Sequence, residues 1–140
     1  MMIPGHKGKK HKITSGQATG KSVTAYKLVH DALDNVEKKL KRNPIEVLVK
    51  AVENGAPREE IITIEYGGAR YPKAVECSPQ RRIDHVLKLI AQAAFQKSFR
   101  SKKSAADYLA DEIVLAYQLN PQSVVITKKV ELERQADASR

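Results

Sequence analysis

The sequence predicts a mainly α-helical fold, a bundle of about five helices with one protruding two-stranded β-hairpin. Apolar residues recur at three- and four-residue spacing in five stretches, which is typical of helices that bury one face. Only one stretch alternates apolar and polar residues, and it surrounds a Gly-Gly pair, which indicates a hairpin. The 140 residues are enough for one core, and with 5% aromatic residues and no Trp that core must be mostly aliphatic.

The first two helices are expected at about 23–41 and 43–55. The predicted inner face of the first consists of Ala25, Leu28, Val29, Ala32, Leu33, Val36 and Leu40. A turn before it should deliver Ser22 or Thr24 as the helix cap. In the second helix Asn43 caps, Pro44 takes the first helical position and Gly55 ends the helix. Its predicted inner residues are Leu48, Val49, Ala51 and Val52.

The hairpin is expected at about 61–77. Its alternating residues are Ile62, Ile64 and Tyr66, and its turn is Gly67-Gly68. Favoured two-residue turns need positive φ, which glycine supplies, and in this register Glu65 faces Arg70. Tyr66 and Tyr71 flank the turn and have two interpretations. They either pack on one another across the strands or stack on bases of a nucleic acid.

Three further helices complete the prediction. The third begins with Ser78 as cap and Pro79 at the first helical position. Its inner residues are Ile83, Val86, Leu87, Ile90, Ala91, Ala94 and Phe95. The fourth follows Ser104, which forms a capping box with Asp107, and its inner stripe is Leu109, Ile113, Ala116 and Tyr117. The last, at about 125–138, is only weakly amphipathic.

Charge predicts the class of partner. The formal net charge is +9 with a pI of about 9.7, and no acidic residue precedes Asp31. Such a balance favours a nucleic acid first and an anionic membrane second. We find no apolar run long enough for a membrane span and no signal-peptide pattern, so we expect no membrane partner. Cys77 is the only cysteine, which excludes an intramolecular disulfide.

Basic clusters predict where the nucleic acid binds. We expect residues 1–22 to be a basic RNA-binding segment, followed by a single helical domain over 23–140. The candidate RNA-binding residues are Lys7, Lys9, Lys10, Lys12, Lys21, Arg81, Arg82, Arg100, Lys102 and Lys103, and those on the hairpin are Tyr66, Gly67, Gly68, Arg70, Tyr71 and Lys73. Arg81 and Arg82 sit where the helix dipole disfavours cations, which favours a phosphate partner for them.

No motif for catalysis, a cofactor or a metal emerges. Residues 16–22 resemble a phosphate-binding loop but have one residue too few between the glycines, and no buried strand precedes them. The histidines lack ligand partners, and His30 and His85 are expected in ordinary surface pairings with Asp31 and Asp84. We therefore predict no enzyme activity, no cofactor, no metal and no small-molecule substrate. A nucleotide hydrolase using Lys21 stays as the enzyme alternative.

An ordered series of short pieces resembles a known family. The pieces are Gly20-Lys21 with Leu28-Val29 and Ala32; Asn43-Pro44-Ile45-Glu46-Val47-Leu48; Glu53-Asn54 through Pro57-Arg58-Glu59; Tyr66-Gly67-Gly68; Ser78-Pro79-Gln80-Arg81-Arg82; Leu109-Ala110-Asp111-Glu112; Lys128-Lys129 with Glu131, Glu133 and Arg134; and Ser139-Arg140. Together they cover about 120 residues and resemble the small-subunit ribosomal protein seven family in its archaeal form. The residues Met1-Met2-Ile3-Pro4-Gly5 resemble the end of a helix that precedes the Gly-Lys motif in that family, so we expect an N-terminally truncated chain.

The resemblance implies a role in the cytoplasmic ribosome. A member of this family binds the lower part of the 3′ major domain of small-subunit ribosomal RNA, nucleates assembly of the subunit head, and lies near messenger RNA and exit-site transfer RNA. Its other partners are neighbouring ribosomal proteins of the head and platform. The main alternative is a DNA-bending architectural protein, because helices with a β-arm also suit binding in a groove of DNA.

Overall fold

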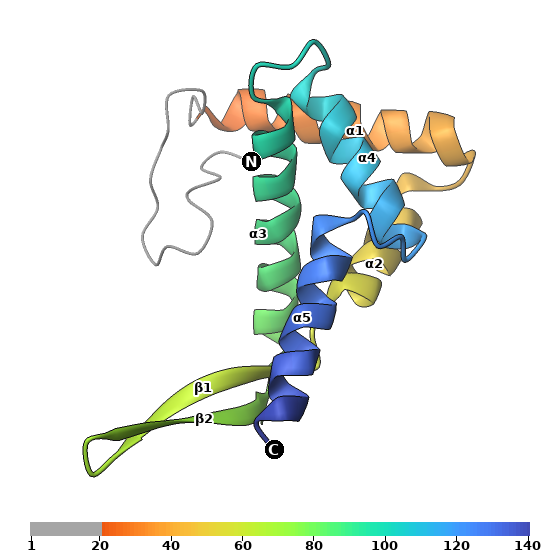
Figure 1. The fold of residues 1–140 in the computed structure, drawn as a ribbon. Coiled ribbons are helices and arrows are strands. Elements are labelled where there is room, and N and C mark those ends of the chain that lie inside the picture. The colour runs from red at the N-terminus through yellow and green to blue at the C-terminus, as the bar shows by residue number, and fades with distance from the viewer. Residues whose placement is uncertain (1–20) are drawn as a thin grey trace.

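The computed structural model describes residues 21–140 and has five helices and one two-stranded antiparallel hairpin (Figure 1). The elements are α1 (Ser22–Leu40), α2 (Pro44–Gly55), β1 (Glu59–Tyr66), β2 (Ala69–Glu76), α3 (Pro79–Ser98), α4 (Ala105–Tyr117) and α5 (Val124–Ala138). The predicted fold class is confirmed, and the hairpin begins two residues earlier than expected. The candidate residues Lys7, Lys9, Lys10 and Lys12 lie outside the described residues.

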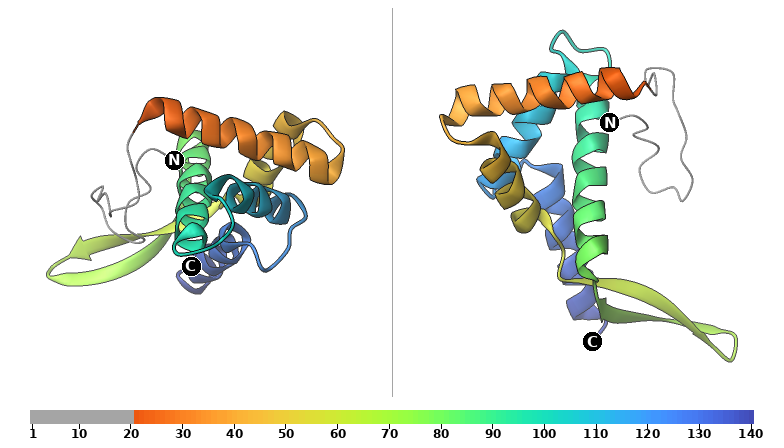
Figure 2. Two further views of the ribbon diagram at one scale, coloured as in Figure 1. Left: turned by 90° about the horizontal axis from the view of Figure 1, so that it is seen from above. Right: turned by 180° about the vertical axis from the view of Figure 1, so that it is seen from behind.

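Helix α4 is the centre of the bundle. Helices α1, α2 and α3 each pack against it, and α5 packs against α3 and the hairpin. Helix α1 crosses the end of α3 that is opposite the hairpin, as the two views in Figure 2 show. The core at these contacts is aliphatic, with Val36, Val47, Val86, Ile113 and Val125 almost wholly buried. None of the described helices has the length and apolar character needed to span a bilayer.

Local capping fixes where three of the helices begin. Asn43 accepts the backbone N–H of Ile45 at 3.0 Å, as expected for a cap followed by proline. Ser78 and Ser104 likewise accept N–H groups in the first turns of α3 and α4. The prediction of a Ser22 or Thr24 cap for α1 is wrong. Lys21 holds the cap position without a side-chain bond, because Ser22 already has helical geometry.

The inward faces of α2 and α3 are rotated from the predicted stripes. Val47, Leu89 and Ala93 are buried although they were not predicted inside. The residues of these two helices predicted inside but found exposed are Val49, Ile83 and Leu87, with exposed fractions of 53%, 44% and 46%. On α1, Val29 was also predicted inside and is 36% exposed. The physical reason is that each helix contains a second apolar row at helical spacing, and the position of α4 decides which row is covered.

A buried carboxylate joins three helices. Glu112 on α4 is fully buried and lies 3.0 Å from Lys97 Nζ on α3. It also accepts the Ser123 hydroxyl at 2.7 Å and the backbone N–H of Val125 at 3.4 Å. Burying a charge is costly unless it is paired and hydrogen-bonded, and here it is both. Glu112 therefore fixes the start of α5 relative to α3 and α4.

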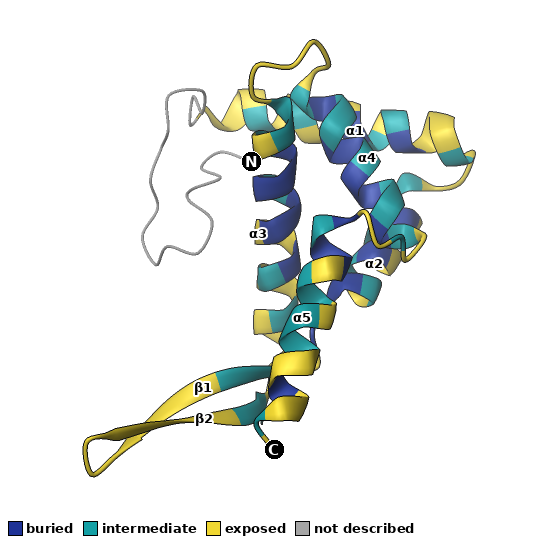
Figure 3. Ribbon diagram, viewed as in Figure 1, coloured by how far each residue is buried: buried dark blue, intermediate teal, exposed yellow. Residues whose placement is uncertain are grey.

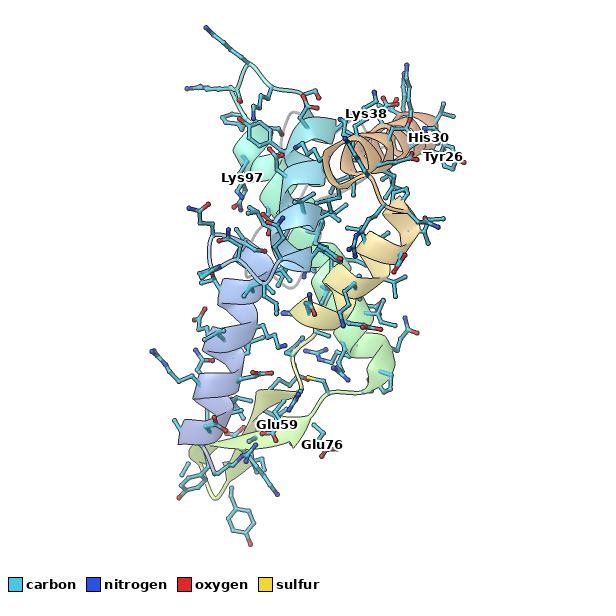
Figure 4. All side chains as sticks on the ribbon, turned by 90° about the vertical axis from the view of Figure 1, so that its right-hand side faces the viewer. Tyr26, His30, Lys38, Glu59, Glu76 and Lys97 are labelled. Carbon is cyan, nitrogen blue, oxygen red and sulfur yellow. The ribbon has the colours of Figure 1, made fainter. Side chains whose placement is uncertain are left out.

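The hairpin is held at its root, and the part beyond the root projects away from the helical body. The root residues Glu59 and Glu76 face one another across the ladder, at the end of the hairpin nearest the body (Figure 4). Glu59 pairs with Arg140, and Glu60 lies 2.5 Å from Arg81 Nε at the start of α3. From Ile62 to Lys73 every residue of the hairpin is exposed, as the yellow strands in Figure 3 show. The root therefore sets the direction in which the tip projects.

Candidate nucleic-acid interface

The loop between α3 and α4 contains three of the predicted basic residues on a short, ordered turn. The Ser98 hydroxyl donates to the Phe95 carbonyl at 2.9 Å, and Ser101 N–H donates to the Ser98 carbonyl at 3.3 Å. Arg100, between them, has a positive φ of 54°. Arg100 and Lys102 have no carboxylate within 4.0 Å among the described residues. Both charges are therefore available to a phosphate.

Aromatic rings support the cations of this loop. The Arg100 guanidinium lies 5.4 Å from the centroid of the Phe99 ring, which is half exposed. Lys103 Nζ lies 5.9 Å from the Tyr108 ring and 3.8 Å from an Asp111 carboxylate oxygen. Cation–π contacts orient a charge without neutralising it. Lys103 is thus partly paired within the protein, whereas Arg100 keeps its full charge.

The Arg81-Arg82 pair at the start of α3 divides between two roles. Arg81 is mostly exposed, and its hydrogen bond to Glu60 raises the pKa of its guanidinium. Arg82 is half-buried, and its Nε has no hydrogen-bond partner among the described residues. The sequence around Arg81 and Arg82 gave no reason for cations at a helix start. The structure gives a reason for Arg81, which is its pairing with Glu60. It could not be foreseen, because Glu60 lies on a different element.

Two residues near Arg81 on α3, Lys88 and His85, were not among the predicted site residues. Lys88 is exposed on α3 seven positions after Arg81, which places both residues on one side of the helix. His85 lies between them and is half-buried, and its Nε2 has no hydrogen-bond partner among the described residues. Burial, with Arg81 next in importance, lowers the pKa of His85 and favours the neutral imidazole. The spacing of Arg81 and Lys88 was the available signal.

The hairpin tip presents aromatic and basic side chains to solvent. Gly67 and Gly68 have φ values of 58° and 83°, the positive values expected for the turn. Glu65 faces Arg70, as predicted. Tyr66 faces Ala69 and Tyr71 faces Ile64, so the tyrosines are not directly paired across the ladder. They are 80% and 58% exposed, which leaves their rings accessible.

The structure separates the predicted residues into two groups at opposite ends of α3. The loop with Arg100, Lys102 and Lys103 lies at one end, where α1 crosses, and the hairpin projects from the other (Figure 1). Helix α3 has 20 residues, which at ~1.5 Å per residue separates the ends by about 30 Å. A single nucleic acid that contacts both groups must therefore reach across about 30 Å.

The histidines pair differently from the prediction. His30 lies 3.4 Å from Asp34, one turn along α1, because positions i and i+4 share a helix face and neighbours do not. Asp84 accepts Gln80 Nε2 at 3.1 Å instead of pairing with His85. His30, Asp31 and Asp34 place potential ligand atoms within 4.8 Å of one another. All three residues are exposed, as acidic groups without an ion commonly are, so we assign no metal to them.

Comparison with known proteins gives one consistent result. The family described as "Ribosomal protein S7p/S5e" matches residues 2–140. "Small ribosomal subunit protein uS7" of Nanoarchaeum equitans is 49% identical over the whole chain and 71% of its own length. The proteins of that name from Archaeoglobus fulgidus and Methanosphaera stadtmanae are 46% and 52% identical over 89% and 84% of the chain. The chain spans 64% and 63% of those two relatives, or about two thirds of their length.

Proposed function

The chain belongs to the ribosomal protein S7p/S5e family, and from this premise we propose that it binds small-subunit ribosomal RNA as a structural constituent of the small subunit in the cytoplasmic ribosome. The single observation behind this proposal is the family match over residues 2–140. The family is a structural component of the ribosome and not an enzyme, in agreement with the predicted lack of catalysis. The other partners are neighbouring ribosomal proteins.

The finer role follows the family resemblance. The chain binds the lower part of the 3′ major domain, nucleates assembly of the subunit head, and lies near messenger RNA and exit-site transfer RNA. Its further neighbours are proteins of the head and platform. The projecting hairpin supports this role, because exposed Tyr66 and Tyr71 offer stacking surfaces, and Arg70 and Lys73 offer charge.

The mechanism is neutralisation and ordering of a folded RNA. Arg100 and Lys102 at one end of α3, and Arg70 and Lys73 on the hairpin, neutralise phosphates on separate parts of the RNA. Lys21 and the lysines of residues 7–12 add the basic segment that precedes the helical domain. Arg81, Arg82 and Lys103 contribute less, because Glu60, partial burial and Asp111 respectively limit them.

Neither alternative has matching support. A DNA-bending protein would use the same helices and β-arm, but the family match supports a ribosomal role. A nucleotide hydrolase would need a phosphate-binding loop, and the family is not an enzyme family. Specificity for RNA is therefore what an experiment must establish.

The test measures binding of the whole chain to a 3′ major domain transcript and to duplex DNA of equal length at about 0.15 M salt. We expect the transcript to bind more tightly. The double variant Arg100→Ala/Lys102→Ala should weaken transcript binding by at least about tenfold, because two charged phosphate contacts are lost. Lys50→Ala is the control, because this exposed lysine lies on α2 near Glu53.

Equal affinity for transcript and duplex would contradict the proposed function. An unchanged affinity of the double variant, with the wild-type preference intact, would contradict only the role given to the α3–α4 loop. Saturable nucleotide binding that Lys21→Ala abolishes would favour the hydrolase instead.

A further inference from the structure

An apolar groove lies between α2 and the first half of α3, with Arg82 at its wall. Its lining residues from α2 and the residue after it are Leu48, Val49, Val52, Glu53 and Ala56, and those from α3 are Pro79, Arg82, Ile83 and Leu87. Its volume is about 520 Å³, within the range of about 300–1,000 Å³ for ligand sites. Most of the lining is aliphatic, and the two charged residues are Glu53 and Arg82.

Three of the lining residues were predicted to be buried but are exposed. Val49, Ile83 and Leu87 follow the spacing of core positions but are exposed, and they line the same groove from both helices. A single exposed aliphatic residue needs no explanation, but a shared groove of them is typical of an interaction site. Burial against a binding partner would explain why Val49, Ile83 and Leu87 follow the spacing of core residues.

Arg82 indicates the chemistry of what binds there. Its Nε is buried and has no hydrogen-bond partner among the described residues. A buried donor without a partner is costly, and most such groups in proteins find an acceptor. Glu53, the other charged residue of the lining, pairs with Lys50. The Arg82 guanidinium therefore has no carboxylate within 4.0 Å among the described residues. A carboxylate suits this position, because it also matches the charge of the guanidinium.

We propose that this groove binds an amphipathic helix of a second protein. Aliphatic side chains of that helix contact Val49, Ile83 and Leu87, and one of its carboxylates pairs with Arg82. A helix presents apolar residues on one face at three- and four-residue spacing, which fits a groove between two helices. The inference rests on the proposed function, which brings other ribosomal proteins close to this chain. It adds where one of them binds and how it is recognised.

Other occupants fit the groove less well. Residues 1–20 contain no acidic residue, so they offer no carboxylate for Arg82. A second copy of the chain has the same net charge of +9, which opposes self-association. RNA would leave the aliphatic walls without apolar contact, because its phosphates seek cations and its bases seek aromatic or guanidinium planes. Each of these is a distinguishable outcome of the test.

The test uses the full chain with the photo-crosslinking residue p-benzoylphenylalanine in place of Val49, assembled into small ribosomal subunits. After irradiation the crosslinked species are identified by mass spectrometry. We expect one predominant crosslink to a protein segment with helical apolar spacing and an acidic residue. The same probe at Val130, which is exposed on α5 and does not line the groove, is the control.

Two further variants test the recognition itself. Leu87→Ser, at an exposed position, should lower the crosslink yield from position 49 by about tenfold, whereas Leu119→Ser, outside the groove, should not. Arg82→Leu should also lower the yield per chain incorporated into subunits, because it removes the donor and keeps the wall apolar. Measuring the yield per incorporated chain separates this effect from any weakening of RNA binding.

A crosslink to RNA, to a second copy or to the chain itself would overturn the inference, as would a yield no higher than at Val130. If the chain is incorporated into subunits and one of these crosslinking results is found, only the inference about the groove is wrong, and the proposed function stands. If the unsubstituted chain is not incorporated into subunits, both the proposed function and the inference about the groove are contradicted.

Discussion

At the scale of single residues, Glu112 combines a high cost of burial with complete pairing. It is the largest fully buried side chain of the described residues, and its oxygens contact Lys97, Ser123 and the backbone of Val125. Nothing in the spacing of α4 suggested this role, because Glu112 lies beside the predicted apolar stripe. Only the approach of α3 and α5 turns that position into an interior one.

We predict that Glu112→Ala lowers the free energy of unfolding by about 3 kcal/mol, because Lys97 and Ser123 lose their shared acceptor. The measurement is urea unfolding followed by circular dichroism. Glu37→Ala, at an exposed position of α1, is the control and should change the free energy by less than about 0.5 kcal/mol. A small effect of Glu112→Ala would show that the contacts of Glu112 with Lys97 and Ser123 contribute little to stability.

His85 is the second residue with a role that packing creates. It is half-buried, and the charged groups that face it are Arg81, Glu60, Lys88 and Lys128. Burial is the largest cause of its lowered pKa, followed by Arg81. The neutral imidazole is thus the form that the fold accommodates.

The pH dependence has a definite sign. Unfolded histidine has a pKa of about 6.5, and folded His85 has a lower one, so between the two values the unfolded chain binds more protons. The stability from His85 is present above about pH 6.5 and is lost as pH falls toward the folded pKa. We predict that His85→Gln loses less stability than wild type between about pH 7.5 and pH 5.5, measured by urea unfolding. Equal losses of stability in His85→Gln and wild type would contradict the prediction. His30→Gln is the control, because His30 is exposed.

At the scale of elements, α2 and α5 meet at a glycine. Gly55, the last residue of α2, is buried, and a Cβ there would overlap Val125 Cγ1. Helix propensity alone predicts that Gly→Ala stabilises a helix by about 1 kcal/mol. At this contact the steric overlap should outweigh that gain, so the sign of the effect tests the packing.

We predict that Gly55→Ala lowers the free energy of unfolding by about 1–3 kcal/mol, as overpacked core sites do. Adding Val125→Ala should restore part of the loss, because it removes the overlapping methyl group. A double-mutant cycle measured by thermal or urea unfolding should give a coupling of at least about 1 kcal/mol. Stabilisation by Gly55→Ala would show that the contact is loose.

The elements were largely predictable because their signals are local. Asn43-Pro44, Ser78-Pro79 and Ser104 mark helix starts within a few residues, and Gly67-Gly68 marks the turn. The burial of each helix face was less predictable, because it depends on neighbours distant in sequence. Val47 and Val49 are equally apolar, but the first is 1% exposed and the second 53%.

At the scale of the whole molecule, charge is distributed over two ends that are separated by the length of α3. The identity of the candidate cations could be predicted from the sequence, but not which of them are neutralised within the protein. Arg81 pairs with Glu60, 21 positions earlier, and Lys103 lies 3.8 Å from a carboxylate oxygen of Asp111, eight positions later. Such pairings depend on the tertiary fold, which residue spacing does not specify.

This distribution predicts a steep salt dependence. If about six phosphates are neutralised, the log–log slope of RNA affinity against salt should be of order −4 to −5. The Arg100→Ala/Lys102→Ala variant should reduce its magnitude by roughly 1.5, because two phosphates remain unpaired. Filter binding at several salt concentrations measures both values. A flat wild-type response would contradict an electrostatic mechanism, and Lys50→Ala should leave the slope nearly unchanged.

The anchoring of the hairpin root also has a consequence for the order of events during synthesis. The hairpin strands are neighbours in sequence and can pair as soon as both have been made, within microseconds. Arg140, which pairs with Glu59, is made 81 residues later. At about 5–20 residues per second, several seconds separate the two events. During that interval the root has its Glu60–Arg81 contact but lacks its α5 contacts, so the anchoring of the hairpin is completed only after α5 has been made.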